Sequence, residues 1–232
     1  MDGPPVSRRA RYRAATREEA KEIALRQAAT GGGPAISLNA IGKAMGLSGP
    51  ALYRYFASRD ALITELIVDA YGDLAATMEA ADTAARQCAG PAATARALAA
   101  ALRAWARAQP HRYLLLYGTP VPGYDAPPET VVFTRRIFAP FLNAVAALPA
   151  AESAGTPRLA ALDAQLTSWA CQTDQAVSGP VLRRGLIWWA RLHGLISLEV
   201  EGHFQSMGFD PALLYDAEVD ALLAPGEAAG EP

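Results

Sequence analysis

Apolar residues recur at intervals of three and four along most of this chain, which is the spacing of one face of an α-helix. In residues 16–30 this pattern begins at Thr16 and Glu19, a pair that matches a capping box. The Gly-Gly-Gly-Pro run at residues 31–34 breaks the pattern. We therefore predict a first helix from Thr16 to about Thr30.

Two short helices joined by a tight turn are expected next. Ser37 is suited to cap a helix that ends at Ala44, and Ser48 to cap a second helix, whose first turn tolerates Pro50. Between them, the segment Met45-Gly46-Leu47 provides a residue that accepts positive φ. This order of elements predicts a helix-turn-helix.

From Ser58, which is placed to cap a longer helix, the pattern stays helical and shows almost no strand signal. A proline-rich segment, Gly118–Pro128, is the one irregular stretch. The predicted fold is therefore all-α, with an N-terminal three-helix helix-turn-helix domain followed by a helical bundle. Beyond residue 90 we expect helices at 91–108, 110–118, 128–148, 156–177, 178–208 and 210–223.

Charge is divided unevenly along the chain. The formal net charge is −2, but residues 1–60 carry ten basic and five acidic side chains, a net of +5, and the remainder carries −7. A basic head on an acidic body favours a polyanionic partner at the N-terminal end. We expect residues 1–15 to form a flexible basic arm. Its arginines either contact DNA beside the recognition helix or form a solvated tail that adds only salt-dependent attraction.

The second helix of the predicted motif carries the candidate base contacts. Such a helix presents its N-terminal residues to base edges, while flanking polar groups bind phosphates. Arg54 is the only long hydrogen-bond donor in it and is the candidate for a guanine contact. Gly49 and Pro50 would allow close approach, and Ala51 could meet a thymine methyl group. The same spacing also occurs in proteins that do not bind DNA.

The stretch from Ile41 to Leu62 resembles the TetR family of bacterial transcriptional regulators almost position by position. The Leu-Tyr-x-x-Phe core of that family occurs as Leu52, Tyr53 and Phe56, whereas Gly42 stands where alanine is usual. The resemblance implies phosphate contacts from tyrosines and from a basic residue at the start of the next helix. The full predicted DNA-contact set is Ser37, Ser48, Gly49, Pro50, Ala51, Tyr53, Arg54, Tyr55 and Arg59.

The C-terminal part resembles one subgroup of the same family. Residues 189–194 read Trp-Ala-Arg-Leu-His-Gly and match the Trp-x-x-x-His-Gly signature of the WHG type. The resemblance implies a helical-bundle regulatory domain that binds a small molecule and forms a homodimer. We accordingly expect a helix-turn-helix domain at 16–60, a ligand-binding and dimerisation domain at 61–223 and a disordered tail at 224–232.

Aromatic residues of this domain are candidates for an apolar effector pocket, although the same residues could simply form the core. They are Trp105, Tyr113, Tyr117, Phe133, Phe138 and Trp169. A stripe along residues 178–208, together with residues 156–177, is the candidate dimer interface or, alternatively, packs within its own subunit. Its candidates are Leu162, Leu166, Trp169, Leu186, Trp189, His193, Ile196 and Val200.

The chain shows no sign of catalysis. His193 has no second ligand at metal-binding spacing and is expected to be structural, and no nucleophile motif or phosphate-binding loop is present. We predict no cofactor and no enzymatic activity, two buried cysteines, no membrane partner and a cytoplasmic location. The predicted partners are an operator in double-stranded DNA and a small-molecule effector. The resemblance implies that the regulator is most often a repressor, which the effector releases from DNA. Alternatives are a DNA-binding protein without an effector and a helical-bundle enzyme.

Overall fold

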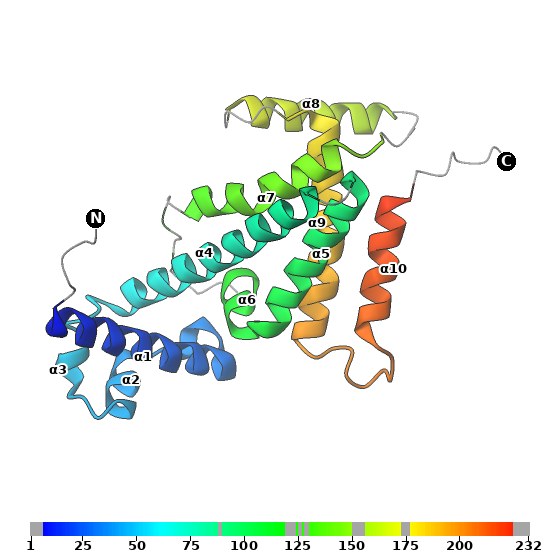
Figure 1. Cartoon of the computed structure of the whole chain (residues 1–232). Coiled ribbons are helices and arrows are strands. Elements are labelled where there is room, and N and C mark those ends of the chain that lie inside the picture. The colour runs from blue at the N-terminus through cyan, green and yellow to red at the C-terminus, as the bar shows by residue number, and fades with distance from the viewer. Residues whose placement is uncertain are drawn as a thin grey trace. The chain divides into compact units, whose positions relative to one another are not determined.

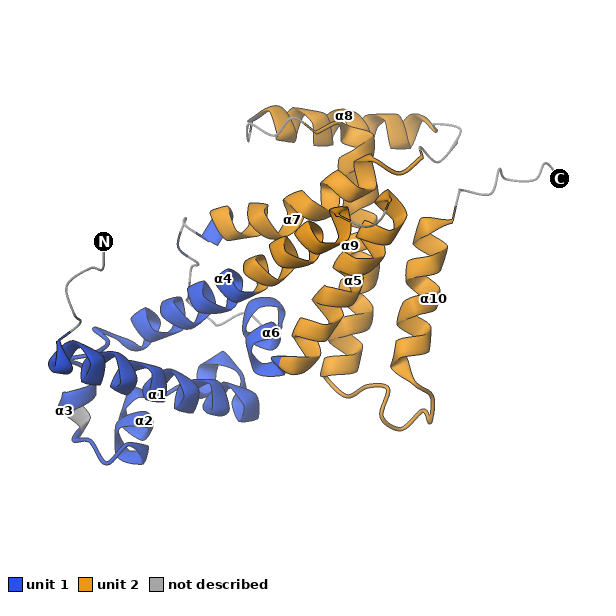
Figure 2. Cartoon of the chain, viewed as in Figure 1, with its two compact units in different colours: residues 1–73, 109–131 blue, residues 74–108, 132–232 orange. Residues whose placement is uncertain are grey.

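The computed structural model describes residues 7–87, 90–118, 124, 127, 130–149, 156–172 and 177–224. Within these ranges the chain is helical and contains no strand, so the all-α prediction is confirmed. The chain divides into two compact units: residues 1–73 with 109–131, and residues 74–108 with 132–232 (Figure 2). In the described part of the chain, no helix is both long and apolar enough to span a membrane.

The first unit begins with a longer helix than the sequence predicted. α1 spans Arg8–Gly31 and is capped by Ser7, whose hydroxyl accepts a hydrogen bond from the Ala10 amide at 3.2 Å. Thr16 lies inside this helix and donates to the Tyr12 carbonyl at 2.9 Å. The predicted start at Thr16 was therefore wrong, because the Arg- and Ala-rich residues before it are good helix formers. Residues 1–6 of the predicted arm lie outside the described residues.

The remaining helices of this unit enclose one apolar core. They are α2 (Leu38–Ala44), α3 (Gly49–Leu52), the first part of α4 (Arg59–Arg86) and α6 (Pro110–Tyr117), with a short 3₁₀ turn at Gly33–Ala35 (Figure 1). We call residues 48–56, which are α3 and the turns that follow it, the recognition segment. Leu52 and Phe56 are almost fully buried and hold this segment on the core. Its other buried members are Ala20, Ile23, Ala24, Ile36, Leu38, Ile41, Leu62, Ile63, Leu66 and Ile67.

The second unit contains the remainder of α4, α5 (Pro91–Ala108), most of α7 (Thr130–Ala146), α8 (Pro157–Gln172), α9 (Gly179–Val200) and α10 (Pro211–Leu223). α9 ends at Val200, before a turn in which Gly202 has φ of +82°, so the predicted extension to residue 208 was wrong. Cys171 is exposed on α8, contrary to the expected buried thiol, and Cys88 lies outside the described residues.

The buried face of α9 does not coincide with the stripe that was the candidate dimer interface or, alternatively, an internal packing face. Gly185, Trp188 and Leu192 point into the unit, whereas Leu186 is exposed and Trp189 is only half-buried. Residues 186–189 are all apolar, so periodicity alone does not decide which of them faces inward. The close packing at Gly185 determines which side of α9 faces inward, since a Cβ atom there would lie 2.5 Å from a methyl group of Leu142.

Charged pairs tie the long helices of this unit together. Arg103 of α5 makes two hydrogen bonds, at 2.8 and 2.6 Å, to the Glu199 carboxylate of α9, and both side chains are largely buried. The Tyr215 hydroxyl of α10 donates to the Ala99 carbonyl of α5 at 2.8 Å. A bidentate, partly desolvated pair such as Arg103–Glu199 fixes the register of the two helices that it joins. α5, α9 and α10 accordingly lie side by side (Figure 1).

The backbones of α8 and α9 approach each other closely at Gly179. Its amide donates to the Thr167 hydroxyl at 3.0 Å, and a Cβ atom on it would lie 2.0 Å from the Asp163 carbonyl oxygen. We expect Gly179→Ala to destabilise the protein by about 1–3 kcal/mol, the usual effect of overpacking against backbone. Chemical denaturation measures this loss. Gly194→Ala is the matched control, since nothing lies within 4 Å of its Cβ position. Equal stability of the two variants would contradict the close approach.

Candidate nucleic-acid interface

The turn between α2 and α3 has the backbone geometry that a helix-turn-helix requires. Gly46 adopts φ of +66°, which confirms its predicted role, since positive φ is strained for residues with a side chain. The Leu47 amide donates to the Gly42 carbonyl at 2.9 Å and closes the turn. Ser37 caps α2 as predicted, its hydroxyl accepting from the Ala40 amide at 3.4 Å.

The recognition segment is shorter in helix than the sequence suggested. α3 covers only Gly49–Leu52, and Tyr53–Tyr55 continue as turns in which the Arg54 amide donates to the Ala51 carbonyl at 3.2 Å. Ser48 occupies the cap position, but its side chain makes no capping hydrogen bond. Pro50 sits in the first turn, where a missing amide proton does no harm.

The exposed side chains of this segment are those expected to meet DNA. Pro50, Tyr53 and Arg54 are exposed, and Ala51 and Tyr55 are partly buried. Ser48 is exposed and Ser37 is partly buried, whereas Gly49 lies outside the residues whose exposure is described. The Arg54 guanidinium and the Tyr53 hydroxyl are therefore both on the exposed side of the motif. The opposite side packs on the core through Leu52 and Phe56. The predicted contacts themselves stay a prediction.

Arg59 has an internal role that the sequence did not suggest. Its guanidinium donates to the carbonyls of Ile36 at 2.9 Å and Gly33 at 2.7 Å, and a third nitrogen lies 3.6 Å from the Asp60 carboxylate. These contacts join the start of α4 to the segment that precedes α2. Arg59 therefore serves the fold, and its phosphate contact stays a prediction.

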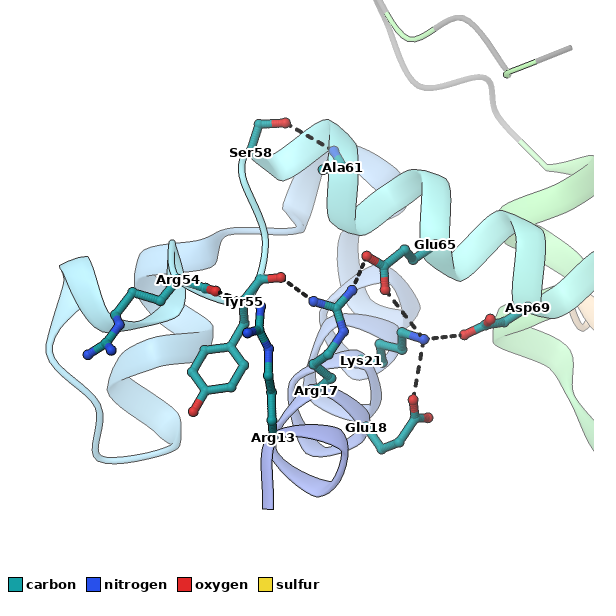
Figure 3. A network of polar contacts seen from close by, with 10 residues as sticks. All are labelled: Arg13, Arg17, Glu18, Lys21, Arg54, Tyr55, Ser58, Ala61, Glu65 and Asp69. Carbon is teal, nitrogen blue, oxygen red and sulfur yellow. Dashed lines mark hydrogen bonds and ion pairs between the residues drawn. The ribbon is translucent and has the colours of Figure 1, made fainter. Parts of the chain in front are cut away.

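Two arginines of α1 contact the recognition segment, and sequence reasoning missed both roles (Figure 3). Arg13 donates to the Arg54 carbonyl at 3.4 Å, and Arg17 donates to the Tyr55 carbonyl and pairs with Glu65 of α4. The arginines are four residues apart and share one helix face. That spacing was visible in the sequence, but their partners lie 38 to 48 residues away along the chain.

The six aromatic candidates for an effector pocket are divided between the two units. Tyr113 and Tyr117 belong to the first, where their ring centroids are 5.3 Å apart and Tyr71 packs edge-on against Tyr117 at 6.4 Å. Burial raises the pKa of Tyr117 and of Tyr71, so both phenols stay protonated. The second unit contains Trp105, which is buried, and Phe133, Phe138 and Trp169.

Those four residues of the second unit have different surroundings. Phe138 packs on Trp189 with ring centroids 4.6 Å apart, and the Arg136 guanidinium lies 5.7 Å from the Phe133 ring centroid. Trp169 is exposed. Tyr113 and Tyr117 therefore contact each other, and the pocket membership of all six residues stays a prediction.

The candidate dimer residues differ in exposure. Leu162, Trp169 and Leu186 are exposed, whereas Leu166, Trp189, His193 and Val200 are partly buried. Ile196 is fully buried within its own subunit, so we correct its assignment to an interface. Ile187 is also exposed and was not among the candidates. Both differences follow from the face that α9 buries in its own unit, which includes Ile196 and leaves Leu186 and Ile187 exposed.

His193 stacks on Trp189, with ring centroids 5.5 Å apart and an interplanar angle of 9°. Burial lowers its pKa, so the imidazole is neutral near pH 7. In the described residues, no group of three His, Cys, Asp or Glu side chains is placed to hold a metal ion. The packing is that of a structural histidine.

A tight turn with positive φ, a buried inner face and an exposed arginine at the end of a short second helix define a helix-turn-helix DNA-binding protein. Comparison with known proteins identifies the family. Residues 22–66 match the family described as bacterial regulatory proteins, tetR family. Residues 95–222 match the tetracyclin repressor-like C-terminal domain. The chain belongs to the TetR family and is a DNA-binding transcriptional regulator, not an enzyme.

Individual relatives agree with this assignment. The chain is 38% identical over 213 residues to the HTH-type transcriptional regulator Rv1816 of Mycobacterium tuberculosis, with 88% of each chain covered. It is 46% identical to the regulatory protein SCO4313, whose crystal structure superposes with a TM-score of 0.77 over 95% of this chain and 100% of that one. The TetR family regulator PfmR from Thermus thermophilus, 17% identical with a TM-score of 0.58, shares the fold over 90% of this chain and 96% of its own.

Proposed function

We propose that the chain acts in the cytoplasm as a homodimeric repressor that binds a quasi-palindromic operator and leaves it when a small molecule binds the helical domain. The observation that carries the proposal is the exposed Tyr53–Arg54 end of the recognition segment on a rigid core. In a two-fold dimer, two such segments would enter successive major grooves about 34–36 Å apart. Each would read one half-site.

An exposed apolar face supports the dimer. We call Leu162, Trp169, Leu186 and Ile187 the α8–α9 face; each has between 41% and 49% of its surface exposed. α8 packs directly on α9, through the Arg183–Asp163 pair at 2.7 Å among other contacts. Large apolar side chains gathered on one pair of helices are typical of a protein interface. Two copies of this helix pair would form a four-helix interface across the two-fold axis.

Regulation would act through the distance between the two recognition segments. α4 contributes residues 59–73 to the first compact unit and residues 74–86 to the second, so it is continuous between them. An effector that favours a different dimer geometry would weaken operator binding. A coupling free energy of about 1–3 kcal/mol corresponds to a loss of affinity between about fivefold and 150-fold.

Fluorescence anisotropy with the DNA that flanks the protein's own gene tests this proposal. The full-length protein is titrated at fixed salt with and without each member of a metabolite panel. The panel includes stearoyl-CoA, because a structure of the regulator FadR from Bacillus subtilis contains that compound. Release by one compound and not by its close analogues is the expected result. Tight, specific binding that no compound weakens would favour a regulator without an effector, in which the helical domain only dimerises.

The exposed arginines at the start of α1 give a separate prediction for affinity. Arg8, Arg9 and Arg11 are exposed, and each phosphate contact contributes about 0.9 to the slope of log affinity against log salt. Replacing all three with alanine is expected to flatten this slope by up to about 2.7 and to leave sequence preference unchanged. The matched triple lysine variant should keep the slope. An unchanged slope in the alanine variant would show that these residues do not reach DNA.

A further inference from the structure

We infer that Arg17 is a positioning residue for DNA recognition, which fixes the backbone of the recognition segment to α1 and α4. The inference rests on the proposed reading of DNA by that segment. Arg17 is not among the predicted DNA contacts and would act through Arg54 and Tyr55, whose carbonyls the α1 arginines hold.

The Arg17 guanidinium binds three different parts of the first unit at once. One terminal nitrogen donates to the Tyr55 carbonyl, and the other donates to the Glu65 carboxylate of α4. The guanidinium carbon also lies 4.5 Å from the centroid of the Phe56 ring. A planar group with fixed donor directions can satisfy a carbonyl and a carboxylate simultaneously, which a lysine ammonium on a flexible stem does less well.

Arg13, one turn earlier on the same face of α1, contacts the adjacent residues. It donates to the Arg54 carbonyl at 3.4 Å, and its guanidinium carbon lies 6.0 Å from the centroid of the Tyr55 ring. Together the two arginines contact three consecutive residues: Arg54, Tyr55 and Phe56. These residues follow the last helical residue of α3, where only a few turn hydrogen bonds hold the backbone. The two arginines contact the backbone there, and the Arg54 side chain points away from these contacts (Figure 3).

A salt-bridge network holds Glu65 in place on the α4 side. Lys21 lies 2.7 Å from Asp69, 3.6 Å from Glu65 and 3.3 Å from Glu18. Burial alone lowers the pKa of Lys21, but hydrogen bonds and charges from Asp69 and Glu18 raise it overall, so the ammonium stays charged. Glu65 therefore has two cationic partners, one of which reaches the recognition segment. The network joins α4 to that segment through a single side chain, Arg17.

The test compares Arg17→Ala and Arg17→Lys with Arg26→Ala, a variant of another α1 arginine that serves as the matched control. DNA sites are first selected from a random library with the wild-type protein. Anisotropy then gives affinity for the selected site and for random DNA over a series of salt concentrations. We expect Arg17→Ala to weaken binding to the selected site by about tenfold or more, with binding to random DNA and the salt slope unchanged. Arg17→Lys should bind the selected site with an affinity between those of Arg17→Ala and the wild type. Arg26→Ala should bind it with the affinity of the wild type.

Two outcomes would overturn the inference. Equal losses on both DNAs, with a salt slope flatter by about 0.9, would make Arg17 a phosphate contact. Unchanged binding to both would leave it without a role in recognition. Glu65→Gln is a second variant, which keeps the test decisive if Arg17→Ala misfolds. It leaves in place the hydrogen bond from Arg17 to the Tyr55 carbonyl, so it should lose discrimination between the selected site and random DNA to a smaller degree. Failure of the wild type to select any site would instead contradict the proposed function.

Discussion

Replacing both Leu162 and Leu186 with glutamate is expected to convert the protein to a monomer and to weaken operator binding at least about a hundredfold. Both side chains belong to the exposed α8–α9 face, so the substitutions leave the fully buried core residues of the subunit unchanged. In a two-fold dimer they would place four carboxylates in one apolar interface. Unpaired charges at such a position oppose association strongly.

Loss of the dimer affects DNA binding through effective concentration. A dimer bound at one half-site holds its second recognition segment near the other, and this linkage typically raises affinity by about 10²–10⁴. Sedimentation and anisotropy on the same preparations measure the two losses. Gln205→Glu with Ser206→Glu is the control, since it adds the same charge at exposed positions beyond α9. A dimer that survives the double leucine substitution would place the interface elsewhere.

Arg54→Ala is expected to remove the preference for one base pair in each half-site. Arg54 is the only long hydrogen-bond donor in the recognition segment, and a bidentate arginine–guanine contact discriminates by about 1–3 kcal/mol. The variant should therefore lose between about fivefold and 150-fold in affinity for the preferred site, while binding to random DNA changes little. Titration of a set of sites, each changed at one base pair, identifies the affected position.

The matched comparison for this variant is Tyr53→Phe. It removes one hydroxyl from the neighbouring exposed side chain and, if that group binds phosphate, should weaken all sites about equally. If Arg54→Ala keeps the wild-type base preference at every position, Arg54 does not contact bases directly. Sequence discrimination would then have to come from DNA shape or from residues outside the recognition segment.

Local sequence patterns predicted the helix-turn-helix well because its determinants are local. Gly46 is a glycine at a turn that needs positive φ, Ser37 is a capping residue before an apolar repeat, and Leu52 and Phe56 have helical spacing. Each signal involves residues only a few positions apart. The resemblance to a known family then supplied the functional meaning, which spacing alone does not give.

The remaining features depend on partners that are distant in sequence. The start of α1 at Arg8 is an exception, because its cap, Ser7, is a local signal that was passed over in favour of the capping box at Thr16. The inward face of α9 depends on Leu142, which lies more than forty residues from Gly185. Arg59 was predicted to bind phosphate, yet it binds carbonyls of its own unit, and Arg17, which had no predicted role, does the same. Tertiary packing decides such cases.

Selection of binding sites from a random DNA library by the full-length protein, with half-site spacing as the readout, tests the central claim most directly. A pair of inverted half-sites centred about 10–10.5 base pairs apart, or slightly more, is the predicted result. Selection by Arg54→Ala should then lose one position from each half-site. If the protein enriches no sequence and binds all DNA equally at moderate salt, the helix-turn-helix at Ser37–Phe56 does not read DNA and the account is contradicted.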